Sequence, residues 1–305
     1  MLAPPPSVEA IHLLLAQGRY VCDKALATTL HLALSLSRPL LIEGKVGVGK
    51  TALARALASG LGRRLVALHC HEGIDLASAV YEWNVPAQLL ALRLLQSKKS
   101  VTPDETPELF SPRYLIRRPL LEALRPDTSG APVLLIDEVD RADPAFEAYV
   151  LEFLAEFAVS VPEAGRFEAT EPPIVIITSN QTRPVSDALK RRCLYHFIAA
   201  PDAATERAIL EARAPGAIER LSQAVVDAVR RVQKSSNAEL GNVADAMAWT
   251  NTLFHIDRTE LDPDRVSAIL NLILKYQDDM LRAEGAEVGE VVKRICAEVA
   301  AMEAT

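Results

Sequence analysis

One short segment combines glycines, a lysine and a hydroxyl group at a spacing that suits phosphate binding. It reads Gly44, Lys45, Val46, Gly47, Val48, Gly49, Lys50, Thr51 and Ala52. Residues 44–51 match the pattern G-x-x-x-x-G-K-[ST]. Glycines at these positions let consecutive backbone N–H groups turn toward phosphate oxygens at the start of a helix. We expect Lys50 to contact the β- and γ-phosphates of ATP and Thr51 to bind Mg²⁺.

A second group of candidates is an apolar run that ends in two carboxylates. The run Val133–Ile136 leads directly into Asp137 and Glu138. The carboxyl ends of parallel strands face the ligand, so we expect Asp137 to hold Mg²⁺ and Glu138 to activate the attacking water. Adjacent carboxylates can also serve only as a helix cap. The nearby Asp140 and Asp143 are interpreted as loop and cap residues.

Polar residues follow another apolar run, Ile174–Thr178. Asn180 comes two residues after this predicted strand, and we expect it beside the γ-phosphate, where its amide helps to place the water. The alternative is an ordinary turn asparagine.

A basic trio of residues, Lys190, Arg191 and Arg192, follows a predicted short helix at 187–189. Such a trio is usually a solvated surface. After a strand of this kind, however, one arginine can neutralise charge on the phosphate of a neighbouring subunit. We expect Arg192, in preference to Arg191, to be this arginine finger.

The elements that position these residues alternate between strands and helices. Residues 7–36 are predicted to be helical with a break at Gly18, and residues 51–61, 87–96 and 118–124 form further predicted helices. The remaining predicted strands are 40–43, 65–70 and 194–198. This pattern predicts an α/β domain over residues 1–200 with a parallel sheet covered on both faces, including the N-terminal helical segment 1–36. Strand signals stop there, and residues 201–305 are predicted to form a smaller all-helical domain.

The composition is that of a globular protein, and its acidic balance disfavours a protein that coats nucleic acid, although it leaves room for a basic patch. Its 33 basic and 40 acidic residues give a net charge of −7, whereas nucleic-acid-coating proteins are usually basic. Its four cysteines form no C-x-x-C pair. The first residues lack a signal-peptide pattern, and no uncharged apolar run approaches the ~20 residues of a membrane span. We therefore expect a cytoplasmic protein.

Taken in order, these motifs resemble those of AAA+ ATPases and, in detail, those of the MoxR family. The further matching segments are Glu72–Asp75, Tyr81–Trp83, Arg118–Leu121, Ser179–Asn180 before Arg183, and Arg191–His196. The last segment is similar to the CoxD-like branch found beside CO dehydrogenase genes. The resemblance implies an αβα core with a helical lid, a hexameric ring and a chaperone-like role in metal-centre maturation or activation of a client enzyme. It also implies a partner with a von Willebrand factor A domain. Many AAA+ lids carry a sensor arginine, but the corresponding stretch 241–249 contains none.

Lys45 permits an alternative, because MinD and ParA partitioning ATPases carry an early lysine in the same loop. Two features disfavour that class: the loop starts only at residue 44, and Glu138 follows the acidic strand. Lys45 is then a solvated loop residue, or else it contacts phosphate.

Two other functions are disfavoured by the sequence. A nucleic-acid motor is the main alternative, but a predicted hairpin at 159–173 holds three glutamates and a single arginine, which would repel a phosphate backbone. The run His69, Cys70, His71 and Glu72 suggests a metal site. Consecutive strand residues point in opposite directions, so a closed four-ligand site is disfavoured.

Overall fold

The computed structural model describes residues 5–97, 107–202, 204–205, 208–209 and 212. The helical domain predicted for residues 201–305, including the stretch 241–249, lies almost wholly outside these residues. The phosphate-loop motif, the acidic strand and the basic trio all lie within them.

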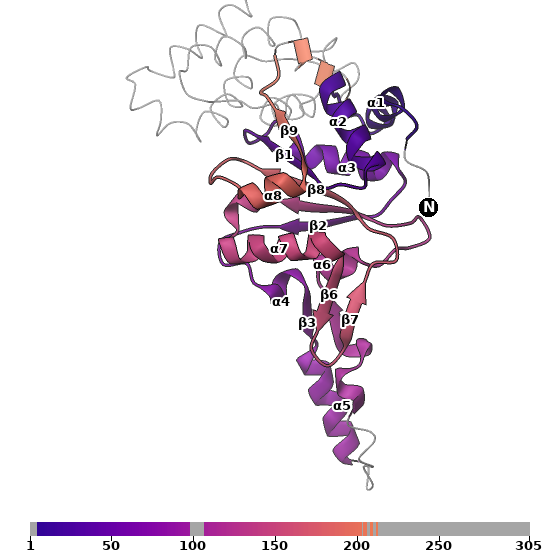
Figure 1. The fold of residues 1–305 in the computed structure, drawn as a ribbon. Coiled ribbons are helices and arrows are strands. Elements are labelled where there is room, and N and C mark those ends of the chain that lie inside the picture. Colours follow the sequence, from indigo (N-terminus) through magenta and orange to yellow (C-terminus); the bar gives the residue numbers. More distant parts are fainter. Residues whose placement is uncertain (1–4, 98–106, 203, 206–207, 210–211, 213–305) are drawn as a thin grey trace, which may run out of the picture. The chain divides into compact units, whose positions relative to one another are not determined.

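A five-stranded parallel sheet forms the centre of the described part of the chain (Figure 1). In spatial order its strands are β2 (Leu65–His69), β5 (Val133–Asp137), β8 (Ile174–Ser179), β1 (Leu40–Gly44) and β9 (Leu194–Ile198). These are the five predicted strands, each with bounds within one residue of the prediction. All four neighbouring pairs are parallel, so the predicted sheet is confirmed.

The register of the sheet brings the polar strand ends to one edge. His69 lies opposite Asp137, and Glu43 lies opposite Ser179. Ile136 lies opposite Ile177, which puts Asp137 and Thr178 at the same level. Residues far apart in the sequence therefore meet beyond the carboxyl ends of β1, β5 and β8.

Helices cover both faces of the sheet, as the alternating pattern predicts. One face packs against α1 (Val8–Gln17), α2 (Lys24–Ser35) and α3 (Lys50–Gly60), and the other packs against α6 (Pro119–Ala123) and α7 (Pro144–Glu156) (Figure 1). The predicted break at Gly18 is confirmed, because Gly18 caps the end of α1.

Successive strand residues enter the two cores in turn, as the period of a strand requires. Leu40 and Ile42 pack with α1, α2 and α3, whereas Leu41 packs on the side of α6 and α7. In β5, Leu134 packs on the side of α6 and α7, and Leu135 packs on the side of α1, α2 and α3. The central strands are thus apolar on both faces, which explains why they read as continuous hydrophobic runs.

The start of α7 follows from its first two residues. Asp143 accepts a hydrogen bond from the Phe146 backbone N–H at 2.7 Å, and Pro144 occupies the first helical position. Asp143 is therefore the predicted cap. The large apolar residues of this helix belong to the core: Phe146, Val150, Phe153 and Leu154 are buried, and Phe157, which follows the helix as its C-cap, is partly buried.

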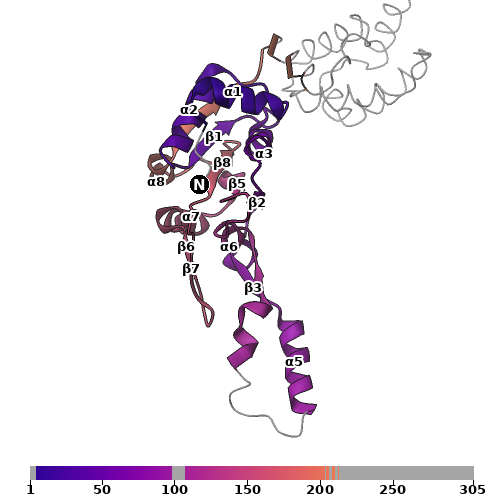
Figure 2. The same ribbon diagram turned by 90° about the vertical axis from the view of Figure 1, so that its right-hand side faces the viewer.

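The long connection between β2 and β5 contains elements that the sequence pattern did not reveal. The predicted helices are present as α5 (Val85–Ser97) and α6, but α4 (Leu76–Ala79) and an antiparallel pair, β3 (Tyr81–Trp83) with β4 (Leu115–Arg117), were missed. Three-residue strands are too short to show a period. Beyond this pair α5 projects away from the sheet (Figures 1 and 2), with Leu89, Leu90 and Leu94 each more than half exposed.

A second hairpin confirms the prediction for residues 159–173. It consists of β6 (Ala158–Val161) and β7 (Gly165–Glu168). The Arg117 guanidinium lies over the Phe167 ring, 5.6 Å from its centroid, so this hairpin contacts β4. Within the described residues, no helix is both long and apolar enough to cross a membrane.

The core position of Phe153 gives a test of the fold. Phe153→Ala should lower the free energy of unfolding by about 3–5 kcal/mol, because a large side chain that is only 1% exposed leaves a cavity. Phe197, which is 46% exposed on β9, provides the control. Urea unfolding followed by circular dichroism should show a much smaller loss for Phe197→Ala; equal losses would contradict the packing described here.

Candidate functional site

The phosphate-loop motif connects the end of β1 to the start of α3. A side chain at Gly44 would place its Cβ 2.4 Å from the Ile198 carbonyl oxygen, so only glycine fits beside β9. Gly49 precedes α3 with φ +99°, and no side chain caps this helix. The first backbone N–H groups of α3 are therefore directed toward the loop without an internal acceptor, which suits an anion.

The Lys50 side chain lies inside this loop. Its Nζ donates to the carbonyl oxygens of Gly44 and Lys45, both at 2.7 Å, and the residue is only 6% exposed. Burial lowers the pKa of Lys50, and the carboxylates of Asp137, Asp140 and Glu138 oppose that shift. The positive charge of Lys50 thus lies next to the loop in which phosphate oxygens are expected.

The two predicted magnesium ligands face each other. Thr51 Oγ1 lies 3.1 Å from both carboxylate oxygens of Asp137. Thr178, which aligns with Asp137 across the sheet, donates its hydroxyl to Asp137 Oδ1 at 2.6 Å. A carboxylate beside a hydroxyl is a hard oxygen donor set of the kind that Mg²⁺ prefers.

Glu138 is held at both its backbone and its side chain. Its φ of 57° is left-handed, and its backbone N–H donates to Thr178 Oγ1 at 3.0 Å. Asn180 Nδ2 donates to Glu138 Oε1 at 2.9 Å, and Arg141 Nη1 donates to Oε2 at 3.0 Å. The structure therefore brings Glu138 and Asn180 into direct contact.

Asp140 is not the ordinary loop residue that the sequence suggested. It lies in the 3₁₀ turn η4 (Val139–Arg141) and is only 3% exposed. Its carboxylate accepts from the backbone N–H groups of Asn180 (3.1 Å) and Thr182 (2.9 Å) and from Thr182 Oγ1 (2.6 Å). Burial alone would raise the pKa of Asp140, but these hydrogen bonds outweigh burial and lower it.

A second buried carboxylate holds the far end of the same loop. Glu147 on α7 is 3% exposed; it accepts from the Ser186 backbone N–H at 2.8 Å and pairs with Arg183 at 3.1 Å. Arg183 also donates to the Ala142 carbonyl. The loop from Asn180 to Ser186 is thereby fixed to the helix that follows the acidic strand.

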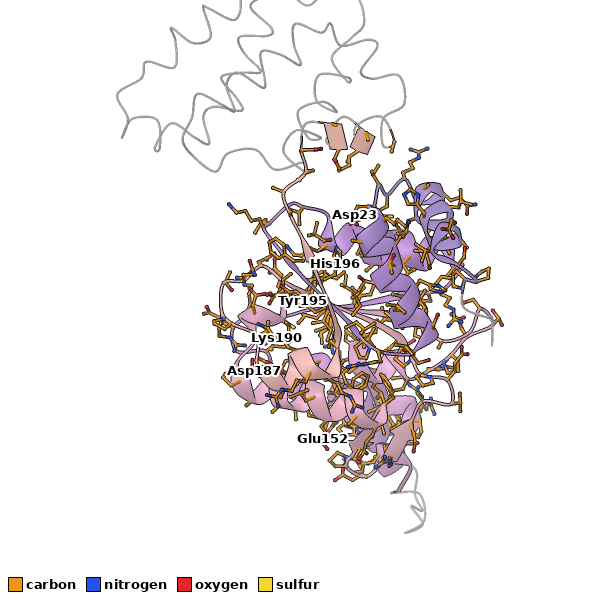
Figure 3. All side chains as sticks on the ribbon, turned by 45° about the horizontal axis from the view of Figure 1, so that its top comes forward. Asp23, Glu152, Asp187, Lys190, Tyr195 and His196 are labelled. Atoms are coloured by element: carbon orange, nitrogen blue, oxygen red, sulfur yellow. The ribbon has the colours of Figure 1, made fainter. Side chains whose placement is uncertain are left out.

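Glu43, the residue before the glycine loop, connects β1 to its surroundings. It is 5% exposed and accepts from Gln181 Nε2 at 3.2 Å and from the Tyr195 hydroxyl at 3.0 Å. Tyr195 lies on β9, which runs between α2 and α8 (Asp187–Arg192) (Figure 3). Burial, and then the hydrogen bond to Glu43, raise the pKa of Tyr195.

The basic trio lies within α8, in its last turn, and not after a shorter helix as predicted. Arg192 Nη2 donates to the Leu154 carbonyl of α7 at 2.8 Å. The Arg191 and Arg192 carbonyls both accept from Arg38. Both arginines are exposed as whole residues.

The remaining predicted loop residues lie where the motif places them. Val46 is 62% exposed, Lys45 is exposed, Gly47 has φ +83°, and Val48 is half-buried. Ala52 packs beside the core on the side of α1, α2 and α3. Contact of these residues with a nucleotide stays a prediction.

The side chains of the run from His69 to Glu72 have different surroundings and do not converge on one point. His69 is exposed and its Nδ1 lies 3.3 Å from Asp137 Oδ2, whereas Cys70 is 2% exposed. His71 contacts the Glu72 carbonyl at the surface. Among the described residues, no three His, Cys, Asp or Glu side chains are grouped to hold a metal ion.

Sequence reasoning missed four supporting residues: Glu43, Asp140, Glu147 and Thr178. One of them left a signal, since a glutamate inside an otherwise apolar strand requires a partner when buried. The other three resemble many polar residues near strand ends or on helices.

Comparison with known proteins found one family match. Residues 39–193 match the family model described as AAA domain (dynein-related subfamily). The matched range begins before β1 and ends just after α8, so it includes the glycine loop, the acidic strand, Asn180 and the basic trio. A comparison with curated proteins found no match.

The buried thiols provide a test of this site. Burial raises the pKa of Cys70 and of Cys193 to about 12, so both stay neutral thiols at pH 8. Native protein treated with iodoacetamide at pH 8 should leave both unmodified, whereas unfolded protein should react at both. Peptide mass spectrometry measures the labelling. Rapid labelling of Cys70 in folded protein, or one zinc ion per chain that is lost in Cys70→Ala, would overturn this description.

Proposed function

The chain belongs to the AAA domain family, dynein-related subfamily, and we propose on that premise that it hydrolyses ATP with Mg²⁺ as the cofactor. The observation that carries the proposal is the contact between Asn180 and Glu138 beside the Thr51–Asp137 pair. A candidate base, its orienting amide and a magnesium donor set thus meet next to one phosphate loop.

The residues of the loop suit a nucleotide. Gly44 lets the loop pass close to β9 and Gly49 takes the left-handed turn before α3, Lys50 supplies a positive charge, and Thr51 with Asp137 supplies oxygens for Mg²⁺. ATP supplies the phosphoanhydride bond that is broken, and Mg²⁺ neutralises charge on its phosphates. We assign Glu138 to accept a proton from the attacking water, while Asn180 keeps the glutamate carboxylate oriented.

We extend the proposal to a ring in which Arg192 serves the neighbouring subunit. Arg192 lies on α8, which follows the Asn180 loop directly, and it is exposed. Its guanidinium donates to the Leu154 carbonyl, so reaching a neighbour requires that this hydrogen bond be exchanged. Arg191, in the same helical turn, is the alternative.

We further propose a chaperone-like role of the MoxR type, on a client metalloenzyme and with a partner that carries a von Willebrand factor A domain, in the cytoplasm. The exposed leucines of α5 support a protein client, because apolar side chains suit protein surfaces better than phosphate backbones. Membership of the CoxD-like branch and a hexameric ring are parts of this proposal.

The hairpin of β6 and β7 disfavours the alternative of a nucleic-acid motor. Its exposed residues include Glu163 and Glu168, and Arg166 already pairs with Glu156 at 2.8 Å and with Glu168 at 3.7 Å. No unpaired positive charge is therefore left on the described strands of this hairpin to attract a phosphate backbone.

The base is tested by a matched pair of variants. Glu138→Gln should bind ATP as the wild type does but lose most hydrolysis, because an amide cannot accept the proton. Lys50→Ala should weaken binding itself. Phosphate release and binding of a fluorescent ATP analogue separate the two effects. Hydrolysis by Glu138→Gln at the wild-type rate would show that Glu138 is not the base.

The finger is tested by mixing two inactive variants. Arg192→Ala should fold and bind ATP but lose on the order of 10³-fold or more in rate, because charge on the transferred phosphate is no longer offset. Mixing it with Lys50→Ala should restore part of the activity, since some mixed rings join an intact Lys50 site to an intact Arg192. Arg191→Ala should be milder. If mixed oligomers form without any rescue, or if Arg191→Ala is the inactive variant, the assignment fails.

A further inference from the structure

Asp140 connects the turn that follows β5 to the loop that follows the neighbouring strand β8. It belongs to the turn η4 that directly follows Glu138, yet its side chain accepts three hydrogen bonds from the loop after β8. One carboxylate oxygen accepts from the Asn180 N–H, and the other accepts from the Thr182 N–H and hydroxyl. A buried carboxylate with three donors from one loop fixes the position of that loop.

The segment that Asp140 holds has an unfavourable backbone conformation. Gln181, between its two N–H donors, has φ +61°, and Glu138 has φ +57°. Non-glycine residues adopt this region only where the surroundings hold them there. The bonds to Asn180 and Thr182 lie on either side of Gln181, so Asp140 supplies that restraint directly.

Through Asn180 this restraint reaches the carboxylate of Glu138, the proposed base. The Asn180 backbone is held by Asp140, and its side-chain amide donates to Glu138 Oε1 at 2.9 Å. Since Asp140 lies two residues beyond Glu138, these contacts form a closed ring through Glu138, Asp140 and Asn180. A shift of the loop would therefore move the amide away from the Glu138 carboxylate.

We infer that Asp140 is a positioning residue for ATP hydrolysis, which holds Asn180 so that its amide orients the Glu138 carboxylate. The inference rests on the proposed function. It differs from a purely structural anchor in one respect: loss of Asp140 should slow turnover in protein that remains folded and still binds ATP.

The chain offers matched variants for this test. Asp140→Asn replaces one carboxylate oxygen with an NH₂ group that accepts no hydrogen bond, so in either orientation of the amide the donors from Asn180 or those from Thr182 lose their acceptor. Asp143→Asn makes the same chemical change three residues later, where the carboxylate only caps α7 and asparagine also caps well. Thr182→Val removes one donor to Asp140 at nearly constant shape, and Thr182→Ser restores it.

Steady-state ATP hydrolysis by the full chain, with circular dichroism to confirm folding, gives kcat and KM. Asp140→Asn should lower kcat by on the order of 10²-fold, the cost expected for a misplaced catalytic group, while KM stays near the wild-type value. Thr182→Val should lower kcat by a smaller factor. Thr182→Ser and Asp143→Asn should retain the wild-type kcat.

Several outcomes would overturn the inference. These are a wild-type kcat in folded Asp140→Asn, a raised KM with unchanged kcat, or equal losses in Asp140→Asn and Asp143→Asn. If Asp140→Asn does not fold, the Thr182 pair decides, and equal kcat values for valine and serine count against the inference. A wild-type chain that hydrolyses no ATP overturns the proposed function together with this inference, whereas an active wild type with unaffected variants overturns the inference alone.

Discussion

The hydrogen bond from Thr178 to Asp137, 2.6 Å long, is the interaction on which the rest of the site depends. It exists because β5 and β8 are parallel neighbours in register, so that Asp137 at the end of β5 lies level with Thr178 near the end of β8. Thr178 also accepts from the Glu138 backbone N–H, which fixes the direction in which the chain leaves β5. From that point the left-handed Glu138 and the turn that follows carry their side chains toward the loop after β8. The order of the strands thus determines which polar groups meet.

This edge of the sheet concentrates negative charge. Glu43, Asp137, Asp140 and Glu147 are each at most 6% exposed, and neutral hydroxyl, amide and backbone groups donate to the first three. Burying carboxylates in this way is costly unless each finds donors or cations. Within the described residues Lys50 is the buried cation near this group; burial lowers its pKa, and the carboxylates of Asp137, Asp140 and Glu138 oppose that shift. Such an edge favours a divalent cation, which is consistent with the pairing of Thr51 and Asp137.

The sequence predicted the parts of the fold that rest on long regular patterns. The five strands and the helices that cover them are apolar runs or periodic segments, and the glycine loop and the acidic strand carry recognisable spacings. The short pair β3–β4 could not be predicted, because three residues show no period and the pairing joins distant segments. Asp140 and Asp143 illustrate the same limit at the site. They are chemically identical and three residues apart, and only the fold shows that one is buried against the Asn180 loop while the other caps a helix.

The pair β3–β4 has a consequence for how this protein can vary. Tyr81 lies opposite Arg117, and the Asn84 backbone N–H donates to the Tyr114 carbonyl at 2.8 Å, so the two ends of the excursion that contains α5 are fastened together. The segment between Asn84 and Tyr114 therefore leaves the domain and returns to it at the same point. Because the entropic cost of closing a loop rises only slowly with its length, segments of different size and sequence can be exchanged between Asn84 and Tyr114 without moving the sheet. A segment of different surface chemistry can therefore replace this excursion while the α/β core stays unchanged.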